Sequence, residues 1–252
     1  ERFEFVRKIY NFINESHSFN GKEGFAVFSP QLLMSLAENE RLTLADLFRQ
    51  GMQVNYVISC EAHLWGLVNA LPTLPQSRQS EYVQDILRLA NELTLRPMVT
   101  EAMTRVIFTM PCESRATMVD LVARGLKRDA KKGDKHFIIN ILSEVTSCLD
   151  EDACSIVADA VAPLIFDTDI HLVRKALDYF SCNLGSLSEK QRYPYVLMIS
   201  GLANDLSLGC DVCETLKKVL PVLTNPQERA QITWVISHFE DRNERSGNLG
   251  EY

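Results

Sequence analysis

The chain has 252 residues, of which 46% are hydrophobic and 23% charged, and its formal net charge is -7 at pH 7. This composition is that of an ordinary globular protein with one or two domains. The acidic balance disfavours a non-specific nucleic-acid binder, which usually carries a basic face. No apolar run reaches the ~18 residues of a membrane-spanning helix, so we expect no membrane span.

The chain begins with Glu1-Arg2-Phe3-Glu4, without an initiator methionine or the apolar segment of a signal peptide, so we expect an excised fragment. It contains seven cysteines, an odd number. Several of them, such as Cys148 and Cys182, fall within apolar helical patterns. This favours reduced, buried thiols in an intracellular, cytoplasmic protein over a secreted disulfide framework.

Residues 1–72 are predicted to form an irregular N-terminal helical region. Apolar residues at helical spacing predict helices over 3–13, 43–51 and 55–71. Ser29-Pro30 predicts a helix that begins there, with serine as N-cap and proline at the first helical position, and that runs to about residue 37. The proline-containing stretch 72–77 then marks either a domain boundary or a tight corner between helices.

The pattern is more regular over residues 79–241, and the polar tail 242–252 is predicted to be disordered. No sustained period-two alternation predicts a strand. The predicted helices span 80–94, 98–110, 115–127, 135–149, 153–166, 169–183, 189–207, 211–223 and 226–241. Alternate helices begin roughly 35 to 38 residues apart, which is typical of an α-solenoid of two-helix repeats. We therefore predict an all-α fold of helical hairpins stacked as a short α-solenoid.

The clearest pair of helices lies between Ala153 and Leu184. Apolar residues at helical spacing flank the break Asp167-Thr168-Asp169 on both sides, and so short a turn makes the two helices antiparallel. Asp167 or Asp169 is expected to cap the second helix, and Gly185 to end it. Each helix has more apolar surface than one partner covers, so we expect similar pairs on either side.

Residues 162–165 (Ala-Pro-Leu-Ile), Asp169 and residues 173–176 (Val-Arg-Lys-Ala) together resemble a HEAT repeat, a member of the HEAT and armadillo-like class of helical repeats. In that family a proline lies late in the first helix, an aspartate sits in the turn and a Val-Arg pair opens the second helix. The resemblance covers about residues 80–241. It implies an architecture and little chemistry. It also implies that Arg174 pairs with an acidic turn residue of an adjacent repeat, for which Asp167 or Asp169 is available.

The resemblance is incomplete in two respects. Residues 219–226 show the same first-helix ending as residues 162–165, yet Pro163 and Pro221 are 58 residues apart, which is not a multiple of the repeat. The other repeats lack the Val-Arg pair. The repeat register around residues 189–207 is therefore left open.

The favoured function is a non-enzymatic scaffold or adaptor that binds another protein or a peptide on its repeat surface. One candidate binding site is the basic stretch between two helices, which would suit an acidic protein surface, a phosphoinositide headgroup or nucleic-acid phosphates. The alternative is a solvated loop that complements the preceding helix dipole. Polar residues that flank the apolar stripe of the second helices are the other candidates. The candidate partner-binding residues are Lys127, Arg128, Lys131, Lys132, Lys135, His171, Arg174 and Lys175.

Two cysteine motifs supply the competing functions. Cys60 and His63 share one face of a predicted helix and would be the nucleophile and base of a cysteine-based hydrolase or transferase, or else a core thiol beside a partly exposed imidazole. Cys210 and Cys213, at a helix start that would lower a thiol pKa, would join a zinc or redox site only with further ligands, for which Cys182 and His238 are the candidates. We favour the structural interpretation of both motifs and expect no metal or cofactor.

Overall fold

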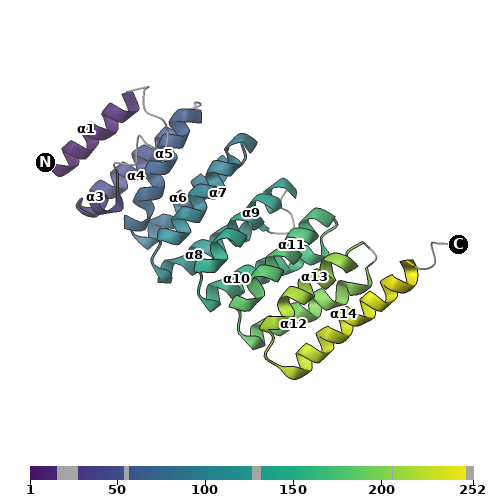
Figure 1. Cartoon of the computed structure of the whole chain (residues 1–252). Helices are drawn as coiled ribbons and strands as arrows, with labels where there is room; N and C mark the ends of the chain where they lie inside the picture. The colour runs from purple at the N-terminus through teal and green to yellow at the C-terminus, as the bar shows by residue number, and fades with distance from the viewer. Residues whose placement is uncertain (16–27, 54–56, 127–131, 206, 248–252) are drawn as a thin grey trace. The chain divides into compact units, whose positions relative to one another are not determined.

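The computed structural model describes residues 1–15, 28–53, 57–126, 132–205 and 207–247, and throughout these ranges the regular structure is helical, without a strand (Figure 1). The predicted all-α class is therefore confirmed. None of the described helices combines the length and the apolar character that crossing a bilayer would take.

The chain divides into two compact units, Glu1–Leu121 and Val122–Tyr252, and the division falls within α8 (Cys112–Ala123). The predicted division into residues 1–72, 79–241 and 242–252 rests on sequence regularity and stays a prediction. The other helices of the first unit are α1 (Arg2–Glu15), α3 (Pro30–Met34), α4 (Glu38–Met52), α5 (Val57–Ala70), α6 (Gln76–Leu89) and α7 (Arg96–Thr109). Those of the second unit are α9 (Lys132–Val145), α10 (Glu151–Val161), α11 (Ile170–Asn183), α12 (Glu189–Gly201), α13 (Gly209–Val219) and α14 (Pro226–Gly247).

Short polar side chains begin several helices, as predicted. Ser29 accepts a hydrogen bond from the backbone N–H of Leu32 at the start of α3, which ends at Met34, earlier than expected. Asp150 caps α10 in the same way, and Asp169 is the residue that caps α11. Six helices, α6 to α10 and α13, begin two to four residues before the predicted start, because residues of their first turns lie outside the apolar period.

Tight 3-10 turns end most described helices and satisfy carbonyl groups that an α-helix leaves open. As expected, α11 ends next to Gly185: the helix stops at Asn183, and Gly185 lies inside the 3-10 turn Leu184–Ser186 that follows, with a φ that is not positive. Proline enters three of these turns, Leu71–Thr73 after α5, Ala162–Phe166 after α10 and Leu220–Val222 after α13. Pro163 thus follows a first helix and Pro221 a second helix, which explains a spacing that fits no whole number of repeats.

In the first unit, α5 is the central helix. It packs against α3, α4 and α7, and from Cys60 to Ala70 every residue except Glu61 and Ala62 is buried. A helix that is apolar on all sides must be covered on all sides, and α5 meets that condition. Gly66 makes the close approach to α4 possible, because a Cβ atom there would lie 2.5 Å from the ring of Phe48.

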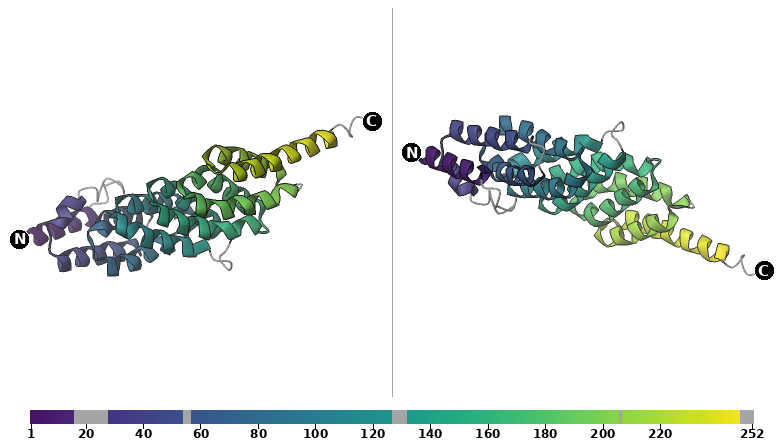
Figure 2. Two further views of the ribbon diagram at one scale, coloured as in Figure 1. Left: turned by 90° about the horizontal axis from the view of Figure 1, so that it is seen from below. Right: turned by 90° about the horizontal axis from the view of Figure 1, so that it is seen from above.

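The second unit consists of two layers of helices. One layer holds the second helices of the pairs, α9, α11 and α13, of which α11 packs against both α9 and α13. In the other layer α12 packs against α14, and α12 also contacts α13 of the first layer. Tyr195 of α12 donates a hydrogen bond to the Asp159 carboxylate of α10, at 2.7 Å, and so links those two first helices. The final helix, α14, continues to Gly247, whereas the sequence predicted an end at residue 241, and its C-terminal end extends past α12 and α13 (Figure 2).

The hydrogen bond between Tyr195 and Asp159 has a counterpart in the first unit. There Tyr82 of α6 donates to Asp46 of α4 at 2.8 Å, and each pair is separated by 36 residues. Burial, followed by the aspartate hydrogen bond, raises the pKa of both tyrosines, so they remain donors at neutral pH. This repeated pair is an internal repeat signal that the sequence analysis missed.

Candidate interaction surface

The structure places part of the predicted basic site in a buried position. Lys127, Arg128 and Lys131 lie outside the described residues, and Lys132 begins α9 with a side chain that is also outside them. Lys135 is only 8% exposed, and its Nζ atom lies 2.8 Å from Oδ2 of Asp167. This ion pair lowers the pKa of Asp167. Lys135 therefore links α9 to the turn between α10 and α11, and its ammonium group forms an ion pair inside the protein.

His136 makes a parallel contact one residue further along α9. Its Nε2 atom lies 3.1 Å from Oδ2 of Asp169, which is the residue that caps α11. Asp167 and Asp169 therefore both face α9. The resemblance implied that one of them pairs with Arg174, and that expectation is wrong.

Arg174 points instead toward the following repeat. Its Nε atom donates a hydrogen bond to Oδ2 of Asp211 on α13 at 2.8 Å, and both side chains are partly exposed. Its neighbour Lys175 reaches in the opposite direction and donates to Oδ1 of Asn140 on α9 at 2.5 Å. Adjacent residues of α11 thus link the helix to both neighbours in its layer.

These contacts define a face of the second unit that we call the second-helix face. It comprises the outward side of α9, α11 and α13. Exposed side chains of both charge signs lie on this face, next to the hydrogen bonds of Arg174 and Lys175. The exposed residues that matter here are Glu144, His171, Asp178, Glu214 and Lys218. Of the predicted partner-binding residues, His171 and Arg174 are exposed and Lys175 is half-buried.

Cys60 and His63 lie in the core of the first unit. Cys60 is 4% and His63 2% exposed, and the Nε2 atom of His63 lies 3.3 Å from the hydroxyl group of Tyr10. Burial, with a smaller contribution from Glu61, raises the pKa of the Cys60 thiol. A cysteine nucleophile needs a lowered pKa, so the shift has the wrong direction for the predicted chemistry. His63 was expected to be partly exposed, and that expectation is wrong.

The other cysteines are distributed between core and surface. Cys213 is buried, and burial raises its thiol pKa, opposite to the effect expected of a helix start. Cys210 and Cys182 are exposed, so the expectation of a buried Cys182 is wrong. The ring of the proposed further ligand His238 stacks on Trp234. Among the described side chains, no three or more His, Cys, Asp or Glu are grouped so that they could hold a metal ion.

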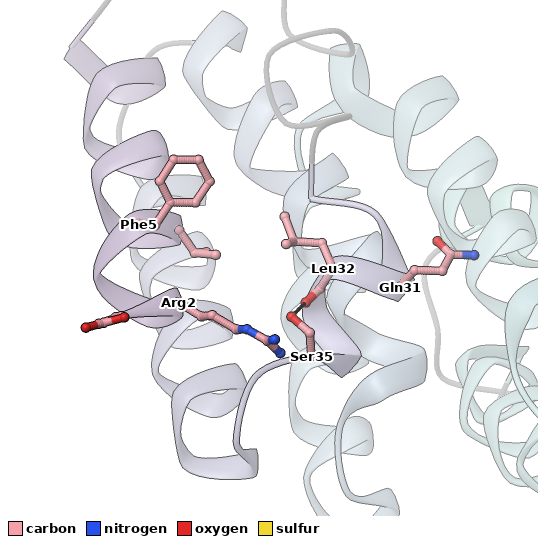
Figure 3. A pocket seen from close by; sticks show the side chains of 7 residues that line it. Arg2, Phe5, Gln31, Leu32 and Ser35 are labelled. Carbon is pink, nitrogen blue, oxygen red and sulfur yellow. Dashed lines mark hydrogen bonds between the residues drawn. The ribbon is translucent and has the colours of Figure 1, made fainter.

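A pocket that the sequence did not predict lies between α1 and α3 in the first unit (Figure 3). It has a volume of ≈ 670 Å³ and is lined by Glu1, Arg2, Phe5, Val6, Gln31, Leu32 and Ser35. The hydroxyl group of Ser35 donates to the carbonyl of Leu32 at 2.6 Å. The lining contains no thiol or imidazole, so it offers no activated nucleophile.

Comparisons with known proteins give a likeness of architecture only. No family model and no curated protein matches the chain. An engineered protein from a structural genomics consortium is 12% identical with a TM-score of 0.44, and the alignment covers 95% of this chain and 61% of that one. A designed armadillo repeat protein, solved in complex with the peptide (KR)4, is 10% identical with a TM-score of 0.46 over 84% of this chain and 98% of that one. Cex1p is 12% identical with a TM-score of 0.38 over 98% and 58%.

Because every one of these TM-scores is below 0.5, the fold assignment depends on the helices themselves. Helices of the repeating pairs begin at residues 76, 112, 151, 189 and 226 and alternate with helices that begin at 96, 132, 170 and 209. Among consecutive helices, α4 packs against α5, α6 against α7, α12 against α13 and α13 against α14. The part of the chain that the structure describes is all-helical and consists of stacked helix pairs.

Proposed function

We propose that the chain is a non-enzymatic, intracellular interaction module that binds another protein or a peptide on the second-helix face. The observation that carries this proposal is the pair of links that α11 makes to its neighbours, from Lys175 to Asn140 and from Arg174 to Asp211. These links hold the exposed side chains of three helices in a fixed register. A partner that spans the helices then meets a preorganised surface, which lowers the entropic cost of binding.

The charges on this face favour a protein partner over a nucleic acid. The carboxylates of Asp178 and Glu214 are exposed on this face, and the guanidinium group of Arg174 already donates a hydrogen bond to the carboxylate of Asp211. Phosphate groups would be repelled by the carboxylates, whereas a peptide with charges of both signs would find complements.

The face can be tested by identifying partners of the full chain in a pull-down and then measuring their affinity. His171→Ala combined with Asp178→Ala removes two exposed side chains, and we expect it to weaken binding at least ~10-fold. Arg229→Ala, at an exposed position of α14, is the matched control and should bind like the wild type. An unchanged dissociation constant in the double variant would contradict the proposal.

The basic stretch needs its own variant, because most of it lies outside the described residues. Lys131→Glu combined with Lys132→Glu reverses two charges there. Loss of the partner would extend the binding site to this stretch. If the variant retains the partner fully, the binding site is confined to the second-helix face.

A further inference from the structure

The start of α13 carries two cysteines three residues apart, Cys210 and Cys213. From the rise and radius of an α-helix, the Cα atoms of residues three apart lie about 5 Å from each other. A disulfide joins residues whose Cα atoms are about 4.4 to 6.8 Å apart. The helix therefore holds the two cysteines at a separation that a disulfide can span.

The two cysteine side chains differ in exposure. Cys210 is exposed, whereas Cys213 is 4% exposed and belongs to the core of the second unit. Burial raises the pKa of the Cys213 thiol, the charge of Lys217 lowers it in part, and the charge of Cys210 is among the smaller causes that raise it. The two sulfur atoms therefore lie within electrostatic reach of each other. A dissolved reagent meets Cys210 first, and Cys213 then reacts with the group that Cys210 has bound.

The start of α13 can tighten enough for the two thiols to meet. Cβ atoms three residues apart on a helix are about 5 to 6 Å apart, and a disulfide brings them to about 3.5 to 4.5 Å. Leu208 precedes the helix without a side-chain cap. The first N–H groups of a helix have no acceptor within it, so the first turn can contract with little loss of helical hydrogen bonding.

A disulfide needs only these two thiols, whereas a structural zinc site would need two more ligands. Among the described side chains no three or more possible metal ligands are grouped. Disulfides that form inside cells are usually transient and serve catalysis or redox sensing. An exposed cysteine followed three residues later by a buried one suits a reversible disulfide of this kind.

We propose that Cys210 and Cys213 form a redox-active dithiol, which low-molecular-weight disulfides such as glutathione disulfide convert reversibly to an intramolecular disulfide. First the Cys210 thiolate attacks one sulfur atom of the reagent, a bond between these sulfur atoms forms, and one glutathione thiolate leaves. The Cys213 thiolate then attacks the Cys210 sulfur, the Cys210–Cys213 bond forms, and the second glutathione thiolate leaves. The protein thiols lose two protons and two electrons, which reduce the reagent to two molecules of glutathione.

Cys112 provides a matched control within the chain. It is exposed and is the first residue of α8, so it also lies at the start of a helix. Arg115 stands three residues later, where Cys210 has a second thiol. Cys112 should therefore react with the same reagent and stop at the mixed disulfide with glutathione.

The test treats the reduced full chain with glutathione disulfide at a pH near the ordinary thiol pKa of about 8.5. The reaction is quenched with acid, the remaining thiols are alkylated, and the peptides are analysed by mass spectrometry. We expect the peptide with both cysteines to lose the mass of two hydrogen atoms and to resist alkylation, while Cys112 gains one glutathione. An excess of reduced glutathione should then restore both thiols.

Two variants separate the two steps. In Cys213→Ala the mixed disulfide at Cys210 should decay at least ~10-fold more slowly than in the wild type, because the intramolecular attack is lost. In Cys210→Ser the buried Cys213 should stay reduced. Circular dichroism verifies that both variants are folded.

Several results would overturn the proposal. Wild-type Cys210 that stops at the mixed disulfide, as Cys112 does, would show that the start of α13 keeps the two thiols apart. Oxidation of Cys213 in the Cys210→Ser variant would contradict the order of the steps. A disulfide from Cys210 to Cys182 or to a second copy of the chain would assign its reactivity to another thiol. A Cys210–Cys213 bond that reduced glutathione cannot reopen would be a fixed structural link and not a reversible centre.

Discussion

Replacement of Gly66 by alanine tests how closely α4 and α5 approach each other. The added Cβ atom would lie 2.5, 2.6 and 2.8 Å from three ring atoms of Phe48, whereas ordinary contacts begin near 3.4 Å. The ring of Phe48 is fully buried and packs edge-to-face against Tyr10 and Phe28, so it has no free space to move into.

The expected magnitude is the difference of two effects. Overpacking a rigid core costs up to ~3 kcal/mol, and alanine in place of glycine within a helix gains about 1 kcal/mol. We therefore expect Gly66→Ala to lower the free energy of unfolding by about 2 kcal/mol. Urea denaturation followed by tryptophan fluorescence measures this, since the neighbouring Trp65 is 3% exposed and its emission shifts when the first unit unfolds.

Gly201→Ala is the matched control, because it makes the same chemical change where a Cβ atom meets nothing within 4 Å. Here only the helix propensity changes, so the variant should gain up to about 0.5 kcal/mol at this helix end, as measured by circular dichroism. If Gly66→Ala unfolds at the same urea concentration as the wild type or at a higher one, the reasoning about the α4–α5 crossing is refuted.

Three further predictions concern single side chains. Tyr195→Phe removes the hydrogen bond to Asp159 and should lower the free energy of unfolding by ~1 kcal/mol, and a double-mutant cycle with Asp159→Ala, which removes the acceptor, should show most of that as coupling. Burial, and next the charge of Glu189, raises the pKa of Glu228, so the folded state holds this proton more tightly than the unfolded chain and loses stability as the pH rises above about 4.3. Glu228→Gln should therefore be more stable than the wild type at pH 7 and equally stable at pH 3 in thermal melts, and a constant difference would contradict this. Cys60 should react with iodoacetamide far more slowly than the exposed cysteines, as mass spectrometry of labelled peptides would show, whereas fast selective labelling would revive the enzyme hypothesis.

The sequence predicted most of the helices because their apolar residues recur at helical spacing. It also located several caps, such as Ser29 and Asp169, since a short oxygen-bearing side chain before an apolar period satisfies the open N–H groups of the first turn. The predicted ends of several helices in the second unit fall at the ends of their 3-10 turns, because these turns continue the apolar pattern beyond the α-helix itself.

The candidate sites were predicted less well, and the reason is the direction of side chains between helices. Lys135 looked like a member of a solvated basic cluster, yet it is buried against Asp167. Arg174 was assigned to an acidic residue of the preceding turn and instead pairs with Asp211, because its side of α11 faces α13. Neither outcome follows from spacing along one helix.

The sequence by itself determined the local order of this protein: all-helical, in pairs that recur at a nearly constant interval, because period and capping act over one or two turns of chain. Tertiary structure alone decided which residues contact across that interval. The hydrogen bonds of Tyr82 and Tyr195 span 36 residues, and those from Tyr193 to Gln231 and from Arg242 to Asn204 span 38. Contacts over such distances depend on how neighbouring helices pack, and this is also why Trp234 remains on the surface while Trp65 lies in the core.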